Sequence, residues 1–152
     1  MRPSRLSTGA RAGVVAWAAT TGAVLGLGLR HGAATRPFAD AGVYVLGAFA
    51  SVTGITSTGA ALVGIALHLA WSVVLGVCFT FVAGALRGAR LALAAIAFGL
   101  LLWAILTRVA PATQPATGVL SLSAPQLLLL NLLLAVGLAL GMRVAQMSYR
   151  VR

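Results

Sequence analysis

The chain has 152 residues, of which 61% are hydrophobic and only 8% are charged. A soluble domain needs about a quarter of its residues charged to cover its surface, so lipid must be much of the solvent around this chain. The net charge of +10 comes from eleven basic residues, all arginine, which punctuate the apolar runs and form no basic domain. This distribution favours anionic lipid headgroups as their partner and argues against nucleic-acid binding.

Four apolar runs are long enough to cross a bilayer as helices, which takes about 20 residues. They are residues 12–29, 60–86, 91–107 and 125–142. The first is longer than a signal-peptide core, and Arg30 follows where a cleavage site would be expected. Pro125 suits the first turn of the fourth helix, which Ser123 can cap. Because lipid offers no partners to unpaired backbone groups, the sequence predicts an all-α polytopic membrane protein of one domain.

A shorter apolar run at residues 41–55 follows Asp40, a candidate N-cap. If this run were a fifth span, the C-terminal arginines would lie opposite the N-terminal ones. With four spans, eight arginines lie on one side and only three on the other: Arg2, Arg5, Arg11, Arg87, Arg90, Arg143, Arg150 and Arg152 against Arg30, Arg36 and Arg108. Basic residues near span ends favour the cytoplasm. We therefore predict four transmembrane helices, both termini cytoplasmic, and an interfacial or re-entrant helix over 41–55 in the first outer loop.

Side chains that carry chemistry are few. Asp40 is the one acidic residue and Cys78 the one cysteine, so paired carboxylates, an intramolecular disulfide and a cysteine-based zinc cluster are excluded. Cys78 is expected to be a small core residue. His68 and Ser72 are neighbours at i and i+4, but they lack a glycine elbow and an acidic orienting group. The sequence therefore predicts a protein that is not an enzyme and holds no metal.

Small and polar residues recur at every fourth position of the second span: Gly64, His68, Ser72, Gly76, Thr80 and Gly84. Small residues at this spacing let membrane helices approach closely, and a buried polar group stabilises such a contact by about 0.6–2 kcal/mol. Gly22 and Gly26 form a similar line on the first span. Asn131 is a second buried polar residue and a candidate partner of His68. We call these residues together the helix-packing seam and predict that neighbouring helices pack on it, with His68 making a polar contact. We also expect Trp71, which lies deep in the membrane, to pack inside the bundle.

The segment "GIALH", which ends at His68, resembles the small-x-x-x-His pattern of bacterial light-harvesting polypeptides. That resemblance implies, as an alternative, a tetrapyrrole ligated by His68. The segment departs from the pattern in having glycine for the usual alanine, and it lies in a four-span chain.

The whole pattern resembles small bacterial four-span membrane proteins of unknown function. A glycine-rich first span is followed by "FADAGVYVLGAFA" and then by "HLAWSVVLG" in the second span. The resemblance implies a fold and a bacterial inner-membrane location but no activity. We expect a non-enzymatic membrane subunit or scaffold without a cofactor that packs against partner helices or itself. A small pore or transporter and a pigment-binding accessory subunit are the alternatives.

Overall fold

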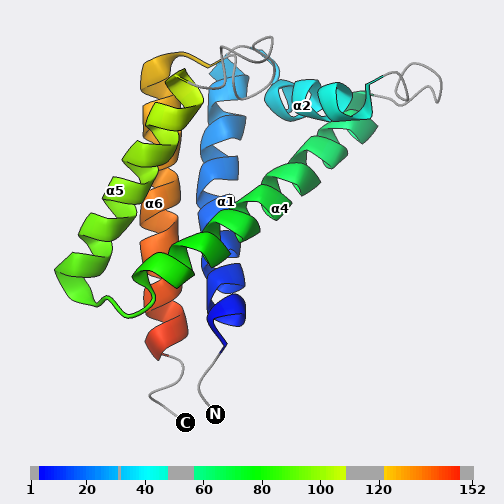
Figure 1. The fold of residues 1–152 in the computed structure, drawn as a ribbon. Coiled ribbons are helices and arrows are strands. Elements are labelled where there is room, and N and C mark those ends of the chain that lie inside the picture. Colours follow the sequence, from blue (N-terminus) through cyan, green and yellow to red (C-terminus); the bar gives the residue numbers. More distant parts are fainter. Residues whose placement is uncertain (1–3, 31, 48–56, 109–121, 148–152) are drawn as a thin grey trace.

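A computed structural model describes residues 4–30, 32–47, 57–108 and 122–147 of the chain. These residues form five helices and no strand (Figure 1): α1 (Arg5–Arg30), α2 (Arg36–Leu46), α4 (Ser57–Ala83), α5 (Gly88–Arg108) and α6 (Ala124–Met147). Four of them, all but α2, are long and apolar enough to cross a membrane. The predicted all-α membrane fold is confirmed.

The ends of the helices differ from the predicted ends in ways that local chemistry explains. α4 stops at Ala83 instead of residue 86, and the chain turns before α5 starts at Gly88, which has a φ of 55°. That backbone conformation favours glycine. α6 begins directly after Ser123, as predicted. There Gln126 accepts hydrogen bonds at Oε1 from the backbone N–H and the hydroxyl of Ser123, at 2.9 Å each, in half of a capping box.

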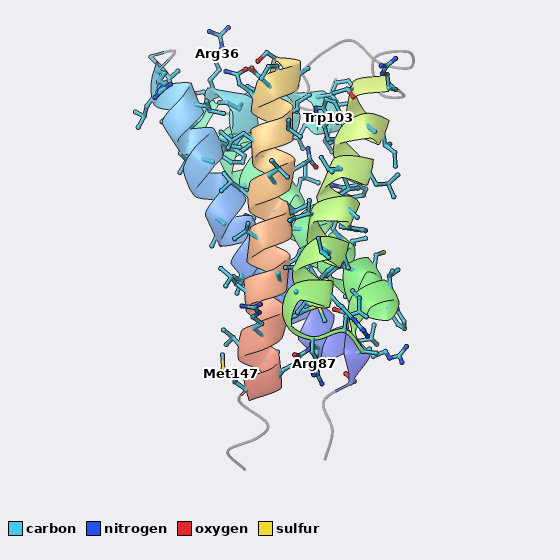
Figure 2. The ribbon with its side chains drawn as sticks, turned by 90° about the vertical axis from the view of Figure 1, so that its left-hand side faces the viewer. Arg36, Arg87, Trp103 and Met147 are labelled. Carbon is cyan, nitrogen blue, oxygen red and sulfur yellow. The ribbon has the colours of Figure 1, made fainter. Side chains whose placement is uncertain are left out.

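The long helices form an open row. α6 packs between α5 and α1, α1 packs between α6 and α4, and α2 packs on α4 (Figure 1). α4 and α5 meet at the turn that joins them and then diverge, so α4 makes little contact with α5 or α6 (Figure 1). Figure 2 shows α1 and α5 on opposite sides of α6. One side of the molecule between α4 and α6 is therefore left open.

The short helix is placed differently from the prediction. α2 starts at Arg36, five residues earlier than expected, and ends at Leu46; residues 48–55 of the predicted helix lie outside the described residues. Asp40 is therefore inside the helix and is not its N-cap, a position that Thr35 holds. The prediction was wrong because Pro37 was not considered as a start signal, although proline suits the first turn. α2 lies against the first turns of α4, at the end of that helix where α1 ends (Figure 1).

Candidate functional site

The predicted seam on α4 is divided between two neighbouring helices. Gly64 contacts the backbone of Phe38 in α2, whereas Gly76 contacts the backbones of Gly9 and Gly13 in α1. A methyl group added at any of these four glycines would collide with backbone atoms of the facing helix. α4 therefore uses its small residues to hold α2 at one end and α1 at the other.

Gly9 and Gly13 were missed by the sequence analysis, although they repeat the four-residue spacing. Gly9 lies outside the predicted span, which began at residue 12 while α1 begins at Arg5, and without Gly9 the spacing that leads to Gly13 could not be recognised. On the other face of α1, the backbones of Ala12 and Ala16 pack just as closely against Gly141 and Gly137 of α6. Extending the search for small residues past the flanking arginines would have found the α1–α4 contact.

Three glycines of the predicted seam make no contact with another helix. Gly22 and Gly26 have no atom within 4 Å of the position of a Cβ, and both are exposed. A methyl group on Gly84 would meet only Thr80 of its own helix. Thr80 itself is buried and donates its hydroxyl to the carbonyl of Gly76 at 2.9 Å, so it satisfies its polar group within α4. Gly22 and Gly26 therefore form a small-residue face of α1 that no other helix of the described residues covers.

His68 lies between the two halves of the seam and is linked to α1. Its Nε2 lies 2.9 Å from Oγ1 of Thr20, and that hydroxyl is also 2.9 Å from the carbonyl of Ala16. The simplest assignment has the Thr20 hydroxyl donating to Ala16 and accepting from the N–H at Nε2 of His68. The ring of Phe38 packs on the imidazole at a centroid distance of 5.8 Å. His68 thus joins α1, α2 and α4.

The sequence suggested Asn131 as a hydrogen-bond partner of His68, and the structure shows no such bond between them. It is buried in α6, and its Nδ2 donates to the carbonyl of Leu127 at 2.8 Å, one turn earlier in the same helix. The prediction was wrong because an asparagine inside a helix can satisfy its amide locally. The backbone of Asn131 instead takes part in helix packing, since its carbonyl faces Gly99 of α5.

A groove of about 570 Å³ lies where α4 diverges from α6. Side chains of α1, α2, α4, α5 and α6 line it, and most of them are apolar. The polar exceptions are Thr20, His68, Ser72, Asn131 and Tyr44. Four helices thus bring hydrogen-bonding groups to one mostly apolar groove.

The environments of Ser72, Trp71 and Cys78 differ from those considered in the sequence analysis. Ser72 is completely buried, and its hydroxyl has no hydrogen-bond partner, so it is not paired with His68 in the manner of a nucleophile and its base. Trp71 was expected inside the bundle but is 56% exposed, and Cys78 is exposed instead of buried. Both predictions were wrong because a helix surrounded by lipid is apolar on every side, so hydrophobicity does not tell inside from outside.

Within the described part of the chain, no three histidine, cysteine or acidic side chains come together in a group that could hold a metal ion. His68 offers a single imidazole, and the nitrogen that the Thr20 contact occupies is Nε2. A tetrapyrrole ligated through Nε2 would have to displace Thr20.

Comparison with known proteins adds no relative: no family model, curated protein or solved structure matches this chain.

Proposed function

We propose that this protein is a non-enzymatic subunit of a membrane assembly and that its α1 helix binds a second copy of the chain. The observation that carries the proposal is the contrast among the glycines. Gly9, Gly13, Gly137 and Gly141 each lie against the backbone of a neighbouring helix, whereas no atom of residues 4–30, 32–47, 57–108 or 122–147 lies close to a methyl group built on Gly22 or Gly26.

The uncovered face has the composition of a helix-packing surface. Ala18, Gly22 and Gly26 follow one another at intervals of four residues, and all three are exposed. Small residues at this spacing allow close crossings of about −40° between membrane helices. Glycine also lowers helix propensity by about 1 kcal/mol relative to alanine, and a position that faces only lipid gains nothing in return. A partner helix on this face would give both glycines a role.

A second copy is the simplest occupant because of orientation. Two copies inserted in the same direction present parallel α1 helices, related by a two-fold axis along the membrane normal. Such a pair is self-complementary, since the same small-residue face serves both partners. The first half of α1 is already covered by α4 and α6, so the contact would be confined to the second half.

Co-purification of two tagged forms tests the proposal. Two forms of the full chain, one carrying an affinity tag and one a fluorescent protein, are expressed together and purified in a mild detergent. We expect the fluorescent form to follow the affinity-tagged one, and the double substitution Gly22→Leu with Gly26→Leu to abolish this. Ala97→Leu is the control, because it places a leucine side chain at an exposed position of another membrane helix, α5. Equal recovery for the double variant and the control would contradict the proposal.

The orientation in the membrane is a second part of the proposal. The described arginines divide between the two ends of the long helices: Arg5, Arg11, Arg87, Arg90 and Arg143 at one end and Arg30, Arg36 and Arg108 at the other. Figure 2 shows Arg87 at the same end as Met147, and Arg36 at the opposite end, which is also the end of Trp103. The positive-inside rule places the end with more arginines in the cytoplasm. We further propose that the membrane is a bacterial inner membrane and that α2 lies at its outer surface.

A further inference from the structure

The groove between α4 and α6 has the size and lining of a small-molecule site. Its volume of about 570 Å³ falls within the range of about 300–1,000 Å³ found for ligand pockets. Leu127, Leu130 and Leu134 of α6 line one wall, and Leu67 and Trp71 of α4 line the other. Leu67 and Trp71 are exposed at the surface of the molecule, so the groove opens toward the lipid.

The volume and the mixed lining fit a small amphiphile, whose hydrocarbon part would meet the apolar walls and whose polar end would meet the polar side chains.

The polar groups in the groove differ in what they offer to a ligand. Ser72 is among the lining residues but is 0% exposed, so its unpartnered hydroxyl is closed to a bound molecule. The amide of Asn131 lines the same groove and has a second N–H and a carbonyl oxygen beyond the bond it makes to Leu127. A ligand with a polar atom here would satisfy groups that the chain leaves available.

The contact between His68 and Thr20 indicates whether the polar group of a ligand donates or accepts a hydrogen bond. If the N–H at Nε2 is donated to Thr20, a neutral imidazole has its lone pair at Nδ1, which accepts hydrogen bonds. A matching ligand therefore donates a hydrogen. It is also uncharged, because no arginine or aspartate is among the residues that line the groove, and a buried charge without a partner is expensive.

We propose that this groove binds an uncharged lipid alcohol, a hydrocarbon body with a free hydroxyl. The hydrocarbon lies against the leucines of α6 and enters sideways from the bilayer past Leu67 and Trp71. The hydroxyl donates to Nδ1 of His68 and accepts from the amide of Asn131. This site is separate from the proposed α1 contact, because neither Gly22 nor Gly26 lines the groove.

Photocrosslinking of the full chain in phosphatidylcholine nanodiscs tests this inference. Three probes share one long chain that carries a diazirine and differ in the head: a primary alcohol, its methyl ether and the carboxylic acid. We expect the alcohol to label peptides that contain residues 67–75 and 127–134. The methyl ether should bind about two- to tenfold more weakly, as the loss of one hydrogen bond predicts. Equal labelling by alcohol and ether, or stronger labelling by the ionised acid, would overturn the proposal.

Substitutions separate binding from folding. His68→Gln retains an acceptor and should keep the alcohol–ether difference, whereas His68→Phe should remove it. Because His68 also links helices, Ala70→Phe serves as a second variant: Ala70 is exposed and lines the groove, so the larger ring blocks it without touching the core. Ala97→Phe is the matched control on α5, outside the groove. Unchanged labelling of Ala70→Phe would contradict the site, and loss of labelling in Ala97→Phe would show that the signal is not specific to the groove.

Discussion

Gly13 of α1 and Gly76 of α4 lie backbone against backbone, so that a methyl group on either would collide with the facing helix. We expect Gly13→Leu to destabilise the fold by about 1–3 kcal/mol, because overpacking forces the two backbones apart. The free energy of unfolding in mixed detergent micelles measures this loss. Gly26→Leu is the control for the single chain, since open space surrounds that position. If Gly13→Leu and Gly26→Leu had the same effect on unfolding, the α1–α4 contact would be incorrect.

The hydrogen bond between His68 and Thr20 gives a second prediction. His68→Leu and Thr20→Val should each cost about 1–2 kcal/mol of unfolding free energy, and the double variant should cost less than their sum. His68→Gln, which retains a donor, should be tolerated. A double-mutant cycle in mixed micelles measures the coupling.

A second double-mutant cycle serves as the control and pairs His68 with Asn131 instead of Thr20. His68→Leu and Asn131→Leu should be additive, because the amide of Asn131 bonds within its own helix. Coupling of His68 to Asn131 and not to Thr20 would support the partner predicted from the sequence over the one in the structure.

The exposure of Cys78 is tested by labelling. It is the one cysteine of the chain and lies on the outer surface of α4. A lipid-soluble maleimide should therefore modify the protein in membranes, whereas a charged, membrane-impermeant maleimide should not until the membrane is dissolved. Mass spectrometry of the intact chain reads both reactions. A thiol that reacts with neither reagent in membranes would be in the core after all.

The orientation proposed from the arginines is tested with a reporter. Alkaline phosphatase, active only in the periplasm, and a fluorescent protein, bright only in the cytoplasm, are fused separately after Arg152. We expect fluorescence and no phosphatase activity. The opposite pattern would reverse the assignment of both termini.

Much of the fold was predictable because lipid imposes one strong requirement: about 20 consecutive apolar residues that satisfy their own backbone. This requirement located α1, α4, α5 and α6. It did not locate α2, which begins at Arg36 and is too short to cross a membrane. There the local signal of Pro37 was more informative than the apolar run that follows it.

The candidate site was predictable in its residue types but not in its pairings. The four-residue spacing indicated Gly64 and Gly76 as packing residues, and their contacts are now known. The same spacing at Gly22 and Gly26 meets no partner helix in the described part of the chain, because periodicity does not say which neighbour packs on a face. For the same reason, hydrophobicity assigned Trp71 to the interior although it is exposed.

Disulfide crosslinking in native membranes tests most directly the proposal that α1 binds a second copy of the chain. In a Cys78→Ser background, Gly22→Cys and Gly26→Cys each place one thiol on the uncovered face of α1, and Ala97→Cys places one on α5. Disulfides need Cα atoms within about 7 Å, so only closely packed helices form them. We predict covalent dimers for the two α1 variants and monomers for the α5 variant. Monomers from all three, or dimers in equal amounts from all three, would contradict the account.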